Sequence, residues 1–595
     1  MCGIVGYTGD REAQGLLLKA LKRLEYRGYD SAGVAIIGER LTVYKDKGEI
    51  SRMESSMPAI RGTHGIAHTR WATHGQPLKN NAHPFVDCKE RIALVHNGII
   101  ENFMSLKEEL MRKGHQFRSE TDTEVIVHLI EDAYEGNLEG AVAVAVKRLK
   151  GSYAIAVVHE GEKGKIVAVR HESPLIVGLG TGETFLASDI PAVLDLTDRI
   201  IPMMDGEMAV LTPQGVQLRT IDGEAVQRDY QRVKYTVQDA ELGGYQHFML
   251  KEIFEQPRAL HQTLLGRLSD RPEQDMGVRF DSVKLVACGT SYHACYVGKY
   301  VFETVLKIPT TAEIASEYRY STPSREMPLT ILVTQSGETA DTLAAAREAK
   351  RRGCYTIGIT NVVGSTITRE VDEVYYTRAG IEIGVAATKT FVTQLAVMYL
   401  LAIKYGALRR VLHSDTQAQM RDALRSMPQV VQSVLNNSEK IEAVAKEIAG
   451  ARDMFFIGRN LNYPVVLEGA LKMKEISYIH AEGYAAGELK HGPLALLTKD
   501  TPVVAVAVPD HTYEKVLSNI GEVSAREAPV VCVGIEGDSD LEKYCDNVIY
   551  VPKVPPLFSA IPVSVALQLL SYYVARERGC PIDKPRNLAK SVTVE

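Results

Sequence analysis

The second half of the chain carries a repeating pattern that restricts its fold more than any other feature. From about residue 280, an apolar strand is followed by a turn containing glycine or serine and then by a helix, and this order recurs. Such a rhythm is typical of a doubly wound parallel sheet covered by helices. We therefore predict an α/β architecture for this half.

Two stretches of this half resemble each other. The strands 284–289 and 454–458 each lead into a helix, and the later strands 329–334 and 503–508 recur at nearly the same separation. An internal duplication is the simplest account, although any two strand-turn-helix segments share these features. We predict two α/β domains, over residues 241–430 and 431–595.

The first 240 residues have a different character. Short alternating strands, such as 65–70 and 91–95, mix with helical stretches near 12–24 and 122–134, which indicates an α+β domain over residues 1–240. The polar stretch that follows contains Gly243-Gly244, and we place the domain boundary there.

Composition excludes several classes of protein. The longest apolar run, 391–403, contains Thr393 and Gln394 and is shorter than the roughly 20 residues of a membrane span. Charged residues at Asp10 and Arg11 come too early for a secretory leader. We therefore expect a cytoplasmic protein without a membrane partner.

The net charge of −6, with Lys and Arg scattered along the chain, argues against a nucleic-acid partner. The eight cysteines include no CxxC pair, and a chain of 595 residues needs no disulfide for stability, so we expect reduced thiols.

Cys2 directly follows the initiator methionine. Removal of Met1 would leave an α-amine beside the thiol, and this amine has an ordinary pKa of about 7.7 to 8.0. It would therefore act as general base for its own side chain. Many cysteines at this position are incidental, so the interpretation depends on the surrounding residues.

A glutamine site needs a fixed cation, a fixed anion and an oxyanion hole. Arg70 at a strand end suits the α-carboxylate, Asp122 suits the ammonium, and Asn97 with the Gly98 N–H suits the oxyanion. Each has a purely structural alternative: a surface ion pair for Arg70, a helix cap for Asp122 and a hairpin turn for Asn97-Gly98.

A metal site is the competing interpretation of this region, because His64, His68, His74 and His83 lie within twenty residues. The first two are spaced for one helix face, but the sequence around them favours a strand, where residues four apart converge less readily. We therefore expect no metal and no cofactor.

Two turns in the second half are suited to a phosphate, which hydroxyls and backbone N–H groups hold well at the start of a helix. Thr290 and Ser291 follow one strand. The second turn offers Thr334, Gln335, Ser336 and Thr339. Ordinary helix capping is the alternative for each turn.

Five ordered blocks, 2–6, 25–33, 69–75, 96–102 and 119–124, together resemble the glutaminase domain of class II amidotransferases. The resemblance implies an N-terminal-nucleophile hydrolase fold, an αββα sandwich in which Cys2 attacks the glutamine amide. It also implies that Thr73 and His74 bind glutamine with Arg70 and Asp122, and that Trp71 gates an ammonia channel.

The two phosphate turns resemble those of sugar isomerase (SIS) domains, with Thr334 in place of the family's first serine. The whole chain is similar to the isomerizing glutamine–fructose-6-phosphate aminotransferases of the bacterial type, which make glucosamine 6-phosphate. That resemblance implies a Schiff base on Lys590, a proton shuttle at Glu475 beside Lys472, and sugar ring opening by His491. It also implies a homodimer, because the histidine loop of this family reaches the neighbouring subunit.

Without the resemblance, Glu475 and Lys472 read as a solvated helical ion pair and His491 as a loop residue. Two other functions stay open at this point. One is an amidotransferase or deglycase acting on a different phosphosugar, and the other is a phosphosugar sensor without catalysis.

Overall fold

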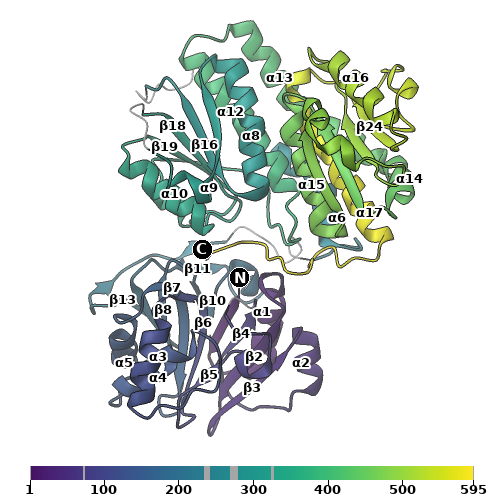
Figure 1. Cartoon of the computed structure of the whole chain (residues 1–595). Coiled ribbons are helices and arrows are strands. Elements are labelled where there is room, and N and C mark those ends of the chain that lie inside the picture. The colour runs from purple at the N-terminus through teal and green to yellow at the C-terminus, as the bar shows by residue number, and fades with distance from the viewer. Residues whose placement is uncertain (1, 72–73, 234–240, 269–278, 323–326, 594–595) are drawn as a thin grey trace. The chain divides into compact units, whose positions relative to one another are not determined.

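The structure, a computed structural model, describes residues 2–71, 74–233, 241–268, 279–322 and 327–593. The chain divides into two compact units (Figure 1). Unit 1 comprises Met1–Glu241 and Ala589–Glu595, and unit 2 comprises Leu242–Leu588. The C-terminal tail is predicted above as part of the last domain, but residues 589–595 group with unit 1.

Unit 1 contains two antiparallel sheets. The first runs in the order β15 (Gln231–Arg232), β11 (Arg199–Pro202), β9 (Ile176–Leu179), β10 (Thr184–Ala187), β1 (Gly3–Thr8), β4 (His64–Arg70), β2 (Ser31–Ile37), β3 (Leu41–Lys47). The second runs in the order β14 (Ala225–Val226), β13 (Gly215–Thr220), β12 (Glu207–Thr212), β8 (Ile166–His171), β7 (Gly151–His159), β6 (Ile92–Ile100), β5 (Phe85–Val86).

Helices cover the outer faces of these sheets. They are α1 (Ala13–Lys22), α2 (Ile50–Ser56), α3 (Phe103–Arg112), α4 (Glu124–Ala133) and α5 (Leu138–Val146). One buried apolar cluster joins the facing sides of the two sheets, including Ile4, Ile66 and Val95. A second cluster packs α3, α4 and α5 on the other side of β6 and β7, while α1 lies against β1 and β4. The αββα sandwich is therefore confirmed.

Unit 2 contains two parallel sheets. One has the order β17 (Thr310–Ile314), β16 (Val283–Ala287), β18 (Leu329–Val333), β19 (Thr356–Thr360), β20 (Glu373–Tyr376). The other has the order β22 (His480–Ala485), β21 (Asp453–Gly458), β23 (Val503–Val506), β24 (Val530–Ile535), β25 (Asn547–Val551). Both place the strand that is second in sequence at the edge and the first beside it, so the expected α/β architecture is confirmed and the shared order supports duplication.

The helices of unit 2 are α6 (Phe248–Phe254), α7 (Gln256–Leu264), α8 (Gly289–Leu306), α9 (Ala315–Tyr318), α10 (Ala340–Arg351), α11 (Ile367–Glu370), α12 (Lys389–Leu408), α13 (Ser414–Asn436), α14 (Ser438–Ile448), α15 (Asn462–Ser477), α16 (Tyr513–Ser524) and α17 (Ala560–Glu577). One apolar core runs through both sheets and the helices α8, α12, α15 and α17 between them. The predicted domain boundary after residue 430 falls inside α13, and the division of this unit stays a prediction.

Helix α12 is long and apolar enough to span a membrane, with a mean hydropathy of 1.5. However, 78% of its apolar window is buried inside the unit, where the helix packs against α7, α8 and α13. Among the described residues it is the one helix that meets this test. Its composition is accounted for by its place in the core.

The expectation that every thiol is reduced is wrong for one pair. Cys532 on β24 and Cys545, just before β25, form a disulfide with their Cα atoms 6.0 Å apart. These strands are parallel neighbours, and their pairing brings together two cysteines that no local motif identifies.

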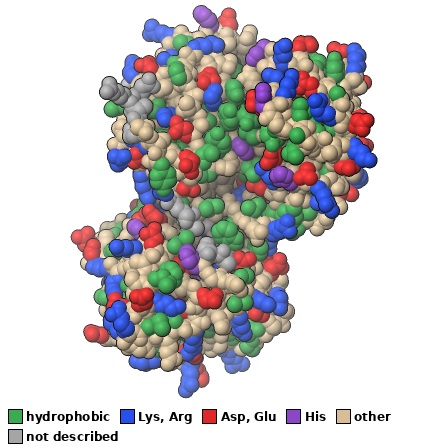
Figure 2. Space-filling view, viewed as in Figure 1, with side chains coloured by type: hydrophobic (Ala, Val, Ile, Leu, Met, Phe, Trp, Pro, Cys, Tyr) green, Lys and Arg blue, Asp and Glu red, His purple; other side chains and the backbone are tan. Residues whose placement is uncertain are grey.

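On the visible face, Lys and Arg side chains are interspersed with Asp and Glu (Figure 2).

Candidate active sites

The first site lies at the start of the central strand of unit 1. Cys2 directly precedes β1, which runs antiparallel to β4 with Gly3 opposite Thr69. The start of β1 therefore lies beside the end of β4. There the Trp71 N–H donates to Cys2 Sγ at 3.4 Å, and the thiol contacts the Trp71 carbonyl at 3.6 Å.

The facing sheet also contributes to this site. Asn97 on β6 donates from Nδ2 to the Cys2 carbonyl at 3.0 Å, and Arg27 donates from Nε to the same oxygen at 3.2 Å. Burial raises the pKa of the Cys2 thiol, although the charges of Arg70 and Arg27 act in the opposite direction. The thiol therefore needs a base to become a nucleophile.

A buried histidine fixes the Asn97 side chain. His68 Nε2 lies 3.1 Å from Asn97 Oδ1 and 3.0 Å from the His96 carbonyl. Because both neighbours are acceptors, Nε2 carries the ring proton. This contact turns the amide so that its nitrogen faces Cys2. Asn97 and Gly98 lie within β6, so the hairpin interpretation of this pair is wrong.

The histidines of this region form a packed, neutral group. The rings of His68 and His83 stack with centroids 3.9 Å apart, and the His96 N–H donates to His83 Nδ1 at 3.2 Å. Burial lowers the pKa of His68 to about 3. Within the described part of the chain, the four histidines considered as metal ligands do not form a metal-binding group.

We expect unit 1 to lose stability as the pH falls below about 6.5. An unfolded His68 binds a proton near that pH, whereas the folded ring resists protonation until about 3. The free energy of unfolding should therefore fall by up to about 1.4 kcal/mol per pH unit for this group. Urea unfolding at pH 7 and pH 5 measures the slope.

His68→Gln keeps a donor for Asn97 but removes the titrating group. The free energy of unfolding of this variant should therefore change less steeply with pH, by up to about 1.4 kcal/mol per pH unit. His171→Gln, at an exposed ring, should keep the slope of the parent protein. Equal slopes in all three proteins would contradict the assignment.

The charged candidates of this site are buried. Arg70 donates to the carbonyl of His74 and, at 3.0 Å, to that of Gly75, so it is no surface ion pair. Asp122 Oδ2 accepts the Ile100 N–H at 2.8 Å. Since Thr123 is the N-cap residue of α4, the helix-cap interpretation of Asp122 is wrong. His74 Nδ1 is buried without a hydrogen-bond partner among the described residues, and Thr73 lies outside them.

Gly98 has a backbone that only glycine tolerates well at this place. Its φ is 138°, and an added Cβ would lie 2.0 Å from the Ser152 carbonyl on β7. Gly98→Ala should push β6 away from β7 and displace Asn97, so we expect glutamine hydrolysis to fall by about 10²-fold. Gly136→Ala is the control, because Gly136 has a φ of 93° and open space around it. Equal activities of the two variants, measured as glutamate release, would contradict this explanation.

The second site lies at the carboxyl edge of the first parallel sheet. β16 and β18 are neighbours, with Ala287 opposite Val333. The turns that follow them therefore meet at the point where the strand order reverses, which is where open α/β sheets bind ligands. The turn after β16 leads into Thr290 and Ser291 on α8, and the turn after β18 contains residues 334–339.

Side-chain hydroxyls order the second of these turns. Thr334 Oγ1 lies 2.8 Å from Thr339 Oγ1 and accepts the Gly337 N–H at 3.2 Å. Ser336 Oγ accepts the Glu338 N–H at 3.1 Å. Gln335 contributes its carbonyl to the Asn361 N–H. Neither α8 nor α10 has a side-chain cap, so helix capping does not account for the hydroxyls.

A buried ionic cluster lies between α8 and α15. Lys472 Nζ donates to Thr290 Oγ1 at 3.0 Å and to Glu475 Oε2 at 2.5 Å, and it lies 3.4 Å from Glu468 Oε1. The second Glu468 oxygen lies 2.7 Å from His293 Nδ1. Only 1% of the Lys472 side chain is exposed, which excludes the solvated ion pair considered above.

The charge on Lys472 is well supported. Burial opposes the ammonium form, but Glu468 and Glu475 outweigh it and raise the pKa of Lys472 above the ordinary value. A permanently charged lysine suits the binding of an anion, whereas a Schiff base needs a neutral amine.

The remaining candidates lie elsewhere. His491 ends the 3-10 helix Ala486–His491 and is exposed, and none of the hydrogen bonds among the described residues joins it to Lys472. Lys590 is half-buried in the tail that groups with unit 1. Their catalytic roles stay predictions.

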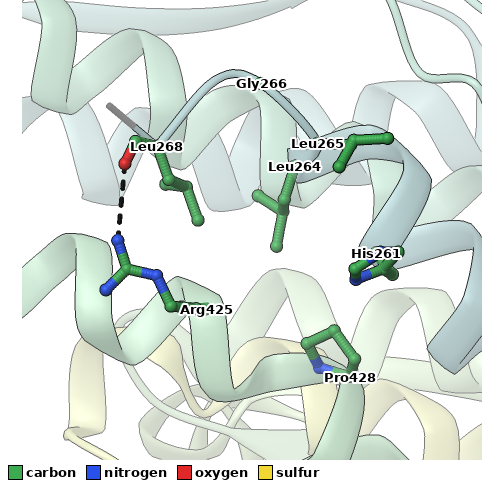
Figure 3. Close-up of a pocket in the computed structure, with 7 residues that line it drawn as sticks. All are labelled: His261, Leu264, Leu265, Gly266, Leu268, Arg425 and Pro428. Atoms are coloured by element: carbon green, nitrogen blue, oxygen red, sulfur yellow. Dashed lines mark hydrogen bonds between the residues drawn. The ribbon is translucent and has the colours of Figure 1, made fainter.

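A hollow of about 420 Å³ between α7 and α13 contains none of the predicted residues (Figure 3). Leu264, Leu268 and Pro428 line it, and Arg425 donates to the Leu268 carbonyl at its rim. Its lining is mainly apolar, with His261 as the second polar side chain beside Arg425, and it contains no residue of the turns after β16 and β18. We therefore place neither site there.

Sequence reasoning missed several residues of the two sites. Arg27 and His68 act across long sequence separations, so only the fold identifies them. Glu468 could have been predicted from the sequence, because it lies four residues before Lys472 and hence on the same face of α15. The other missed contacts are those of His293 with Glu468 and of Gln394, which donates to Ser291 Oγ at 3.0 Å.

Comparison with known proteins covers the whole chain. The SIS domain family matches residues 280–404 and 447–578, and the glutamine amidotransferase domain family matches residues 68–195. The glutamine–fructose-6-phosphate aminotransferase (isomerizing) of Methanosarcina mazei is 50% identical over 618 aligned positions, which cover 100% of both chains. The protein of the same name from Aquifex aeolicus is 49% identical, again over 100% of both chains.

Among solved structures, the C-terminal domain of glucosamine-fructose-6-phosphate aminotransferase from Francisella tularensis is similar to this chain. It has a TM-score of 0.55 and 37% sequence identity, and the match covers 58% of this chain and 99% of that one.

Proposed function

Because the chain belongs to the family of isomerizing glutamine–fructose-6-phosphate aminotransferases, we propose that its two sites divide that reaction between them. The enzyme converts D-fructose 6-phosphate and L-glutamine to D-glucosamine 6-phosphate and L-glutamate. The observation that supports two separate half-reactions is the presence of two separate clusters, one around Cys2 and one around Lys472.

We propose that the Cys2 thiol attacks the amide carbon of glutamine. Its raised pKa means that a base must take the proton, and the α-amine left by removal of Met1 is suited to this. The resulting tetrahedral oxyanion would be held by Asn97 and the Gly98 N–H. Asn97 has two amide hydrogens, and the one donated to the Cys2 carbonyl leaves the other for the oxyanion. Collapse to a thioester releases ammonia, and water then releases glutamate.

Glutamine would be held by its charged end. The buried Arg70 guanidinium is suited to the α-carboxylate and Asp122 to the ammonium. The unpartnered His74 Nδ1 supports a polar contact to the substrate. Thr73 is assigned to the same role by resemblance alone, as is Trp71 to the gate for ammonia.

In unit 2, we propose that the two turns after β16 and β18 hold the sugar phosphate through Ser291, Thr334, Gln335, Ser336 and Thr339. The hydroxyls of Thr334 and Thr339 lie together, and no side chain caps α8 or α10, which supports the assignment.

The chemistry of this site would be shared among four residues. Lys472 stays charged and stabilises negative charge beside the sugar, with Thr290 in contact. Glu475, partly exposed at 21%, moves the proton between C1 and C2. His491 opens the sugar ring, and Lys590 supplies the amine for the Schiff base.

We further propose a cytoplasmic homodimer, in which the exposed His491 serves the site of the partner. Sedimentation that finds only monomers at working concentration would contradict this.

The ammonia is expected to reach the sugar without escaping to bulk water, where it would be protonated. We also propose that unit 2 comprises two domains that meet near residue 430.

A labelling experiment tests the whole assignment. The protein is incubated with fructose 6-phosphate and glutamine carrying ¹⁵N in its amide, in the presence of excess unlabelled ammonium. We expect ¹⁵N in the glucosamine 6-phosphate. Unlabelled product would contradict the internal transfer, and glutamate without any amino sugar would contradict the acceptor.

A further inference from the structure

A second cluster of reactive side chains lies in unit 1, apart from the residues assigned to glutamine. Cys88 follows β5 by two residues, His115 follows α3, and His128 and Glu131 lie three residues apart on α4. We call these four residues the Cys88 cluster. Among the described residues it is the one group of His, Cys, Asp and Glu whose ligand atoms converge, all within 4.8 Å of one another.

The distances within the Cys88 cluster are those of ligands around one ion. Cys88 Sγ lies 3.7 Å from His115 Nδ1 and 3.6 Å from His128 Nδ1. Glu131 Oε2 lies 3.0 Å from His115 Nδ1 and 3.2 Å from His128 Nδ1. Three different chain segments therefore direct one sulfur, two nitrogens and one oxygen toward a common point.

Tetrahedral zinc would give nearly these spacings. With Zn–S near 2.3 Å and Zn–N and Zn–O near 2.1 Å, sulfur and nitrogen ligands lie about 3.6 Å apart, and nitrogen and oxygen ligands about 3.4 Å apart. The observed separations are within about 0.4 Å of these values. The two nitrogen–oxygen separations are also hydrogen-bond lengths, and the Cys88 N–H donates to the same Glu131 oxygen at 3.1 Å. The zinc geometry is therefore argued from the two imidazole nitrogens that lie 3.6 and 3.7 Å from one sulfur.

The outward nitrogens of both imidazoles face carboxylates. His128 Nε2 lies 3.8 Å from Glu124 Oε1, and His115 Nε2 lies 3.8 Å from Asp132 Oδ1. Both separations are ion-pair and not hydrogen-bond distances, and His128 Nε2 has no hydrogen-bond partner among the described residues. The negative charge nearby favours a ring that carries its proton on this outward nitrogen and leaves Nδ1 for the metal. The ring of Phe117 packs against that of His128 with centroids 4.7 Å apart, which holds the ligand in place.

The chemistry of the donors selects the metal. A thiolate and a carboxylate together balance the charge of a divalent ion, and two neutral imidazoles complete the set. Sulfur and nitrogen ligands in a tetrahedron favour Zn²⁺ over the oxygen-seeking Mg²⁺ and Ca²⁺. Four protein ligands fill the coordination shell and leave no open position, as in structural rather than catalytic zinc sites.

We propose that the Cys88 cluster binds one Zn²⁺ ion that fastens α4 to the β5–β6 turn and to the segment after α3. Helix α4 begins two residues after Asp122, and its first residue, Glu124, accepts the Ser119 N–H at 2.7 Å. The ion would therefore stabilise the wall that presents Asp122 to glutamine. This role is independent of the glutaminase chemistry, since it requires only that the cluster binds metal.

The test uses the full chain with Cys2→Ala, because Cys2 and Cys88 are the two cysteines of residues 1–241. The protein is stripped with a chelator, incubated with Zn²⁺ or Co²⁺ and desalted, and retained metal is measured by mass spectrometry. We expect about one ion per chain. Co²⁺ should give a thiolate-to-metal charge-transfer band and the intense d–d bands of a tetrahedral site.

Cys88→Ser and His128→Gln in the same background should reduce retained metal at least about tenfold. Cys580→Ser and His171→Gln, which change a cysteine and a histidine outside the cluster, should retain it. If the cluster variants do not fold, the Co²⁺ spectrum of the parent still decides. A parent protein that retains no metal and shows no thiolate band, or cluster variants that retain as much as the parent, would overturn the proposal.

Discussion

Cys2→Ala should lower glutamine-dependent synthesis of glucosamine 6-phosphate by at least about 10³-fold, because it removes the nucleophile and no other thiol is assigned to this site. Synthesis from added ammonium should persist, since the substitution leaves unchanged the sugar-phosphate residues of unit 2 and Lys590 in the C-terminal tail. The readout is amino sugar formed from glutamine and from ammonium at equal fructose 6-phosphate. The fold should hold, because the Cys2 carbonyl, and not its thiol, receives Asn97 and Arg27.

Two controls sharpen this experiment. Cys2→Ser keeps a nucleophilic oxygen of similar size but lower acidity, and it should also fail with glutamine. Cys580→Ala should behave as the parent protein. Glutamine-dependent activity above about a tenth of the parent value in Cys2→Ala would exclude covalent catalysis by this residue. Loss of ammonium-dependent activity as well would indicate a structural defect and contradict the separation of the sites.

Much of the fold was predictable because its signals are local. The alternation of apolar strand, turn and helix after residue 280 reflects periodicities within ten to twenty residues, and it identified both parallel sheets. The phosphate turns follow from the same logic. Parallel strands end at one edge, so hydroxyls placed directly after β16 and β18 must meet there.

The glutamine site was predictable only in part. Cys2, Arg70 and Asn97 could be named from their residue types, but their meeting depends on the antiparallel pairing of β1 with β4 and on the facing sheet. Asn97-Gly98 has the local signature of a hairpin turn, and the register of β6 with β7 overrides it. His68 shows most clearly what the sequence cannot predict. It orients Asn97 only because its strand, β4, faces β6 of the other sheet.

The Cys88 cluster and the disulfide were not predicted from the sequence, for a related reason. Zinc ligands can be recognised in a sequence when they lie two to four residues apart, as in CxxC. Here Cys88 and His115 are separated by 26 intervening residues, and three segments must fold before the ligands converge. Only His128 and Glu131, one helical turn apart, carried a local signal.

Glu475→Gln should lower amino sugar formation by about 10²- to 10⁴-fold while leaving glutamine hydrolysis unchanged, because the amide cannot carry the proton between C1 and C2. The substitution is nearly isosteric, and Lys472 keeps its buried partner Glu468 at 3.4 Å. A general loss of structure is therefore not expected. The measurement is glucosamine 6-phosphate formed from saturating ammonium, with glutamate release followed in parallel.

A purely structural role of Glu475 would give a different result. In D₂O, a base at this position exchanges part of the transferred proton with solvent, so deuterium should enter the product of the parent enzyme, and the variant should lose this exchange together with turnover. Lys474→Gln alters the same helix at an exposed position and should retain both. If Glu475→Gln kept the exchange and lost only affinity for fructose 6-phosphate, Glu475 would act by holding Lys472 in place, and the proton shuttle would have to be another residue.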